Sequence, residues 1–150
     1  MKAGIVVRQA GLTDLDSIVA LEATCFGVEA FTRRQIRYLL DRAKGQALVA
    51  EENGRVVGWL SLLMRRRLNN CRVYSLAVDA ASRGKGIAGS LMECAIDFAR
   101  AHGCKTLSLE VDIANHAALA LYVKKGFFQC GLKPAYYKDG SDARAMLLML

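Results

Sequence analysis

Apolar and polar positions alternate along the chain with two different periods, one typical of β-strands and the other of α-helices. Strand-like segments are short, and they are predicted at residues 4–10, 47–52, 55–64, 71–78, 104–111, 127–132 and 143–150. Helix-like segments keep their apolar residues on one face, and they are predicted after Thr13 and over residues 31–43, 86–103 and 115–126. The segments predict an α/β protein (α+β mixed) whose mixed sheet has helices on both faces.

Local signals predict several of the boundaries. Thr13, followed three residues later by Asp16, predicts the cap of the first helix. Asn53-Gly54 tolerates the positive φ angles of a type I′ turn, so residues 47–64 predict a β-hairpin. Gly126 is expected just beyond the last helix.

Composition narrows the class of protein. The chain has 150 residues, 53% of them hydrophobic, and no linker or repeat, which predicts a single domain over residues 1–150. Its formal net charge of +7 favours anionic ligands. Five scattered cysteines without a C-x-x-C pair argue against a disulfide framework or zinc cluster. No signal peptide or membrane-spanning run is recognised, so a cytoplasmic protein without a membrane partner is expected.

A glycine-rich stretch, residues 84–89, fits the G-x-G-x-x-G pattern of dinucleotide-binding folds. In those folds the first glycine follows the strand directly, whereas here DAASR separates the strand end near Val78 from Gly84. A P-loop is excluded, because G-x-x-x-x-G-K-[ST] is absent. The remaining readings are an anion site at a helix N-terminus, flanked by Arg83 and Lys85, or glycines that only shape the turn.

Two longer segments resemble the GNAT superfamily of acyl-CoA-dependent N-acyltransferases. They are YSLAVDAASRGKGIA at 74–88 and LEVDIANHAALALYVKKGF at 109–127. The resemblance implies a GNAT fold, with a mostly antiparallel sheet of about six or seven strands and about four helices. It also implies acetyl-CoA (coenzyme A) as cofactor. The pattern [QR]-x-x-G-x-[GA] assigns the CoA pyrophosphate to Arg83, Gly84, Lys85, Gly86, Ile87 and Ala88.

Catalytic residues follow from the same resemblance and from the chemistry of acyl transfer. An amine attacks a thioester only as the free base, and Glu110 is the expected base that removes its proton. Tyr122 matches the tyrosine that protonates or stabilises the departing thiolate, although a core aromatic is the alternative. Asn115 is expected to contact the pantetheine arm or to cap its helix, or both. The backbone of Leu76, Ala77 and Val78 is expected to pair with pantetheine like an added strand.

The acceptor is less defined than the acyl donor. Within the superfamily the chain resembles the ribosomal-protein-alanine N-acetyltransferase (RimI-like) group, which implies a protein or peptide N-terminus as acceptor, with Tyr136 and Tyr137 beside it. Two departures are Asp112, where arginine is common, and the absence of Pro-Trp-Ser near residues 26–31. Asp112 is expected to assist Glu110 or to bind a cationic substrate.

Several alternatives remain open. A lysine or small-molecule amine is the second acceptor class, and a basic CoA-binding module for anionic partners is the non-enzymatic reading. No metal is expected, because His102 and His116 have no ligand partner at zinc spacing. Residues 65–67, three consecutive arginines, predict a solvated loop, with an RNA or acidic-partner contact as the alternative, so nucleic acid is not the expected partner.

Overall fold

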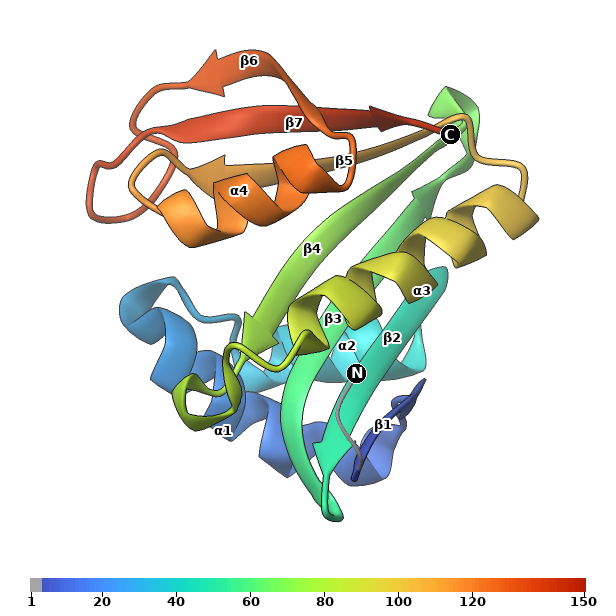
Figure 1. The fold of residues 1–150 in the computed structure, drawn as a ribbon, viewed down its shortest axis with the longest axis vertical. Coiled ribbons are helices and arrows are strands. Elements are labelled where there is room, and N and C mark those ends of the chain that lie inside the picture. Colours follow the sequence, from blue (N-terminus) through green and yellow to red (C-terminus); the bar gives the residue numbers. More distant parts are fainter. Residues whose placement is uncertain (1–3) are drawn as a thin grey trace.

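A computed structural model describes residues 4–150, and it consists of one seven-stranded sheet with helices on both faces (Figure 1). The strands are β1 (Ile5–Gln9), β2 (Gly45–Glu52), β3 (Arg55–Arg65), β4 (Asn70–Val78), β5 (Thr106–Asp112), β6 (Phe128–Lys133) and β7 (Ala143–Met149). The helices are α1 (Leu15–Phe26), α2 (Arg33–Asp41), α3 (Ile87–Ala101) and α4 (His116–Lys124). The sheet order is β1-β2-β3-β4-β5-β7-β6, and only the β4–β5 pair is parallel. The predicted mixed, mostly antiparallel sheet is therefore confirmed.

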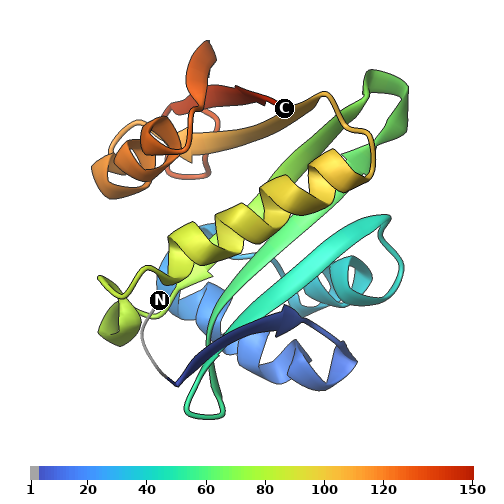
Figure 2. The same ribbon diagram turned by 45° about the vertical axis from the view of Figure 1, so that its right-hand side comes forward.

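Strand alternation produces two apolar cores, one on each face of the sheet. Leu60 on β3 belongs to the core that includes residues of α3 and α4, whereas its neighbour Trp59 belongs to the core that includes residues of α1 and α2. Figure 2 shows α3 lying across one face while α1 and α2 cover the other. Gly58 permits the close approach of α3, because a Cβ atom there would lie 3.1 Å from Ile87 and 3.3 Å from Leu91. Among the described residues, the core beside α1 and α2 includes no residue of β5 or β7, and Ser108 and Glu110 lie among the residues that line the face of these strands opposite α4.

The N-terminus of α1 differs from the prediction. Residues Leu12–Asp14 form a 3-10 turn, and the helix begins at Leu15, so Thr13 does not cap it. Asp14 organises the turn, since its carboxylate accepts the Gly11 N–H at 2.9 Å and pairs with Arg8 of β1 at 2.8 Å. An acidic group that satisfies a free N–H and a cation together is held more firmly than a threonine hydroxyl in solvent. The Asn53-Gly54 hairpin and the end of α4 before Gly126 agree with the prediction.

β4 and β5 separate beyond their first three paired residues. Their pairing runs from Asn70↔Thr106 to Arg72↔Ser108 and is not continued further along β4. A β-bulge at Tyr74 lies just beyond this point, because the β3 partners of β4 change register between Ser75 and Val73. Residues 73–78 therefore pair with β3 alone, and β4 diverges from β5 toward its C-terminal end (Figure 1). In the part of the chain from residue 4 onward, no helix is long and apolar enough to cross a membrane.

Candidate functional site

The glycine turn lies between the end of β4 and the start of α3. Gly84 and Gly86 have φ angles of 79° and 81°, a region that favours glycine, and Gly86 is the N-cap of α3. A Cβ atom at either glycine would meet no protein atom within 4 Å, so the outer side of this turn is open. Ile87 is buried and anchors the turn to the core. An open turn at the N-terminus of a 15-residue helix fits an approaching phosphate group.

The two cations of this turn have protein partners. Lys85 pairs with Glu52 at 2.5 Å, and the Ser82 hydroxyl donates to the other oxygen of Glu52 at 2.9 Å. These bonds tie the turn to the β2–β3 hairpin, and the hydrogen bonds from Lys85 and Ser82 lower the pKa of Glu52. Arg83 Nε donates to the Val78 carbonyl at 3.2 Å. Glu52 could not be identified from the sequence, because an acidic residue beside a hairpin turn carries no local signal of this role.

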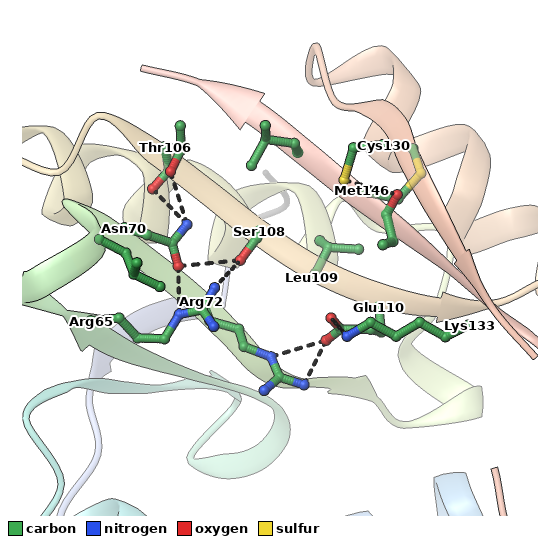
Figure 3. Close-up of a pocket in the computed structure, with 13 residues that line it drawn as sticks. Arg65, Asn70, Arg72, Thr106, Ser108, Leu109, Glu110, Cys130, Lys133 and Met146 are labelled. Atoms are coloured by element: carbon green, nitrogen blue, oxygen red, sulfur yellow. Dashed lines mark hydrogen bonds and ion pairs between the residues drawn. The ribbon is translucent and has the colours of Figure 1, made fainter. Parts of the chain in front are cut away.

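Glu110 is a largely buried carboxylate that two cations hold. Its side chain is 12% exposed, and it pairs with Arg72 of β4 at 2.7 Å and with Lys133 of β6 at 2.8 Å (Figure 3). Burial pushes the pKa of Glu110 upward, but the hydrogen bond from Lys133 and the charge of Arg72 outweigh it, so the net pKa is lowered. The structure thus places Glu110 two residues beyond the last β4–β5 pair, as an ionised group held by two cations.

Asp112 lies on the same face of β5 as Glu110, as the period of a strand requires. Its carboxylate accepts the Ser141 hydroxyl and the Ala114 N–H, both at 2.9 Å. Tyr137 is half-buried in the same region. Burial raises its pKa, and the negative charges of Asp112 and Glu110 raise it further. The β6–β7 loop therefore closes over the β5 carboxylates.

Tyr122 and Asn115 belong to α4. Tyr122 is buried with its ring 5.8 Å from that of Phe127, and burial raises its pKa to about 12. A phenol with a raised pKa stays protonated at neutral pH and can donate a hydrogen bond or a proton. Asn115 caps the helix, since its side chain accepts the Ala118 N–H at 3.2 Å. This capping agrees with one of the two readings of Asn115.

Two loops meet above the site. The Lys138 N–H donates to Glu29 at 2.6 Å, and the Lys138 ammonium donates to the Val28 carbonyl at 3.0 Å, so the β6–β7 loop bonds to the segment after α1. The neighbouring rings of Tyr136 and Tyr137 meet edge-on at 5.0 Å, and the Tyr136 hydroxyl accepts from Arg72 at 3.0 Å. Arg72 therefore links Tyr136 to Glu110, and Tyr137 packs against Tyr136.

A buried glutamate that the sequence did not reveal holds the α1–α2 loop in place. Glu22 of α1 is 1% exposed and accepts from the Phe31 N–H at 3.0 Å, from Trp59 Nε1 at 2.9 Å and from the Ser75 hydroxyl. It links α1, the α1–α2 loop and two strands. The sequence gives one weak signal of this burial, which is that Glu22 directly follows the apolar Leu21. A solvent-exposed glutamate would fit the sequence equally well.

Two further features of the sequence are the candidate metal ligands and the arginine run at 65–67. Within residues 4–150 no group of three His, Cys, Asp or Glu side chains could hold a metal ion. The three arginines at 65–67 are exposed at the β3–β4 connection, as predicted for a solvated loop, although Arg65 also reaches into a pocket beside Glu110. The assembled residues offer an open turn at a helix N-terminus, a strand edge without a partner strand and an ionised carboxylate, which together suit transfer of a group from a phosphate-bearing donor.

The sequence of this chain is similar to those of known acetyltransferases. A family model described as the acetyltransferase (GNAT) family matches residues 15–127. A Bacillus subtilis (strain 168) protein provisionally named a ribosomal protein bS18-alanine N-acetyltransferase is 29% identical over 148 residues, which cover 97% of this chain and 96% of that protein.

Solved structures show the same likeness. The ribosomal-protein-S18-alanine N-acetyltransferase from Escherichia coli has a TM-score of 0.87 and 25% identity, and the match covers 97% of this chain and 93% of that one. A chain of the NatC complex bound to Gag peptide and CoA has a TM-score of 0.87 and 27% identity, with 97% and 98% covered. The likeness thus extends over nearly the whole of each chain.

Proposed function

Because this chain belongs to the GNAT acetyltransferase family, we propose that it transfers the acetyl group of acetyl-CoA to the α-amine of a protein or peptide N-terminus. The chain is an acyltransferase, and the expectation of an N-acetyltransferase is confirmed at that level. The observation that carries the finer proposal is Glu110, an ionised carboxylate held between Arg72 and Lys133 where β4 and β5 begin to diverge.

The residues of the turn and of β4 fit acetyl-CoA. When bound, this group supplies a thioester whose carbonyl carbon is open to attack by an amine. Gly84 and Gly86 leave open space for a pyrophosphate, and the N–H groups at the start of α3 face outward there. The β4 backbone at residues 76–78 has no strand on the β5 side, so it can pair with an extended pantetheine arm. Asn115 and Arg83, both exposed, flank the path.

The lowered pKa of Glu110 favours an α-amine over a lysine. An α-amine has a pKa of roughly 7.7–8.0 and a lysine amine about 10.4, so the α-amine is already partly deprotonated at neutral pH. A carboxylate whose pKa is lowered by cations is a weak base, and it takes a proton from an α-amine more readily than from lysine. Glu110 therefore accepts the amine proton, while the protonated Tyr122 hydroxyl is the donor for the departing thiolate.

The loops that meet over Glu110 support a peptide acceptor. Lys138 joins the β6–β7 loop to the segment after α1, Tyr136 bonds to Arg72, and the half-buried Tyr137 lies within the influence of the Asp112 charge. Phenol groups can bond peptide groups while their rings pack against a small first side chain. The proteins similar to this chain include enzymes named as ribosomal-protein S18-alanine N-acetyltransferases and as an N-alpha-acetyltransferase, which supports the same acceptor class.

A pair of mirror peptides tests the proposal. One carries a free α-amine and a blocked lysine, and the other carries a blocked α-amine and a free lysine. Thiol release from acetyl-CoA, with mass spectrometry of the product, should show acetylation of the first peptide. Acetylation confined to the lysine peptide, or to polyamines and other small amines, would contradict the acceptor assignment and leave the acetyltransferase assignment in place.

A further inference from the structure

A pocket of about 340 Å³ extends from Glu110 along the open face of the sheet (Figure 3). It follows β5 through Ser108 to Thr106 and is bordered by residues from β4, β6 and β7. Arg65, at the end of β3, closes its far side. Binding of the acceptor amine occupies only the Glu110 end and leaves the rest of the pocket without a role.

The charges lining this pocket are unbalanced. Among the described lining residues three are cations, Arg65, Arg72 and Lys133, and one is an anion, Glu110. Arg72 and Lys133 are both bound to Glu110. The pocket therefore carries a formal excess of two positive charges.

Arg65 is the cation available to a ligand. Its guanidinium donates to two neutral oxygens, Asn70 Oδ1 at 2.7 Å and Ser108 Oγ at 3.3 Å, which orient it across the pocket (Figure 3). Asn70 is itself held by Thr106 at 2.9 Å. An arginine aimed by neutral partners keeps its full charge, and its planar fork suits a carboxylate.

The spacing along β5 relates this arginine to the acceptor. Ser108 lies two residues before Glu110, and two residues of extended chain span roughly 6.6 Å. A peptide whose α-amine is bound at Glu110 and which runs extended along β5 would therefore bring its third residue to the level of Ser108 and Arg65. A carboxylate there would meet a cation, whereas an arginine or lysine would meet repulsion.

We propose that Arg65 selects acceptor peptides that carry Asp or Glu at the third residue, by binding that carboxylate in the pocket beside Glu110. The inference rests on the proposed function, because it takes the α-amine of the peptide to lie at Glu110. Arg72 and Lys133 add to the positive potential, but Arg65 makes the contact.

Three otherwise identical lysine-free heptapeptides with free α-amines test this, with Glu, Gln or Arg as the third residue. The kcat/KM for acetylation should be about tenfold higher for Glu than for Gln, and lowest for Arg. Raising the salt concentration should shrink the Glu/Gln ratio, since the contact is between charges. Arg65→Gln should bring the ratio close to one, and Arg65→Lys should keep part of it.

Arg67→Gln is the matched control, because it removes the same charge from an exposed turn residue that does not line the pocket. The Glu/Gln ratio should survive in this variant. A Glu/Gln ratio near one in the parent, or an unchanged ratio in Arg65→Gln, would overturn the inference. If all three peptides were still acetylated efficiently at the α-amine, the proposed function would stand. Failure of every peptide to be acetylated at its α-amine would overturn both.

Discussion

Replacing Glu22 by glutamine tests whether the buried carboxylate holds the α1–α2 loop against the sheet. One oxygen accepts the Phe31 N–H at 3.0 Å, and the other accepts from Trp59 Nε1 at 2.9 Å and from the Ser75 hydroxyl. Glutamine has the same shape but replaces one oxygen by an NH₂ group, which only donates. Because Phe31 and Trp59 donate to different oxygens, either orientation of the amide sets an NH₂ group against one of these N–H donors.

The cost can be worked out from these contacts. A buried donor left without an acceptor costs about 1–3 kcal/mol, and hydrogen bonds to a neutral acceptor are roughly half as strong as those to a charged one. Glu22 is 1% exposed, so water cannot replace the lost partner without opening the packing. We expect Glu22→Gln to reduce the free energy of unfolding by about 2–4 kcal/mol. For a chain of this size, that corresponds to roughly 5–15 °C in Tm.

Denaturant unfolding followed by circular dichroism measures this loss, because that signal is kept when Trp59, the single tryptophan, is replaced. A double-mutant cycle with Trp59→Phe tests whether the loss comes from this contact. Without the indole N–H, the amide of the glutamine at position 22 can point its NH₂ group toward the place that the indole N–H occupied. The Glu22→Gln penalty should then be smaller by at least 0.5 kcal/mol or so. A Glu22→Gln variant within about 0.5 kcal/mol of the parent, or equal penalties in both backgrounds, would refute the reasoning.

Three further substitutions test the remaining parts of the site and fold. Glu110→Gln should lower turnover by roughly 10²–10⁴-fold, with partial recovery at high pH as the amine loses its proton unaided, and equal activity from pH 6 to 9 would remove Glu110 from the mechanism. Gly86→Asp should abolish CoA binding in calorimetry, because it sets a charged side chain at a positive φ in the open turn, whereas Gly54→Asp, with a similar φ and open space, should leave binding intact. The hydrogen bond from Arg8 lowers the pKa of Asp14, so its stabilisation is present above the ordinary carboxyl pKa and is lost as pH falls through the lowered value. Asp14→Asn should therefore destabilise the protein at pH 7, and its deficit in unfolding free energy should narrow below about pH 4, where an undiminished deficit would contradict the assignment.

Local patterns in the sequence determined the elements and one part of the site. Strand and helix periods predicted all seven strands and four helices among residues 4–150, because apolar spacing reflects which side chains face a core. Asn53-Gly54 predicted the hairpin turn, since its residues adopt the positive φ angles that such a turn needs. The Gly84–Gly86 turn was predicted for a similar reason, as its conformation depends on neighbours a few positions away.

Tertiary structure alone decided the charges around Glu110 and the burial of Glu22. Arg72 and Lys133 lie 38 and 23 positions away from Glu110, and only the strand order brings β4 and β6 to its side chain. In the sequence alone, Arg72 and Lys133 look like ordinary solvent-facing residues of a strand. The Thr13 cap failed for the same physical reason: Arg8 of β1 supplies a partner that makes Asp14 the better acceptor, and nothing in the local sequence encodes that contact. Periodicity specifies which face of an element is buried, whereas the pairing of polar groups depends on register and sheet order, which form only when distant segments meet.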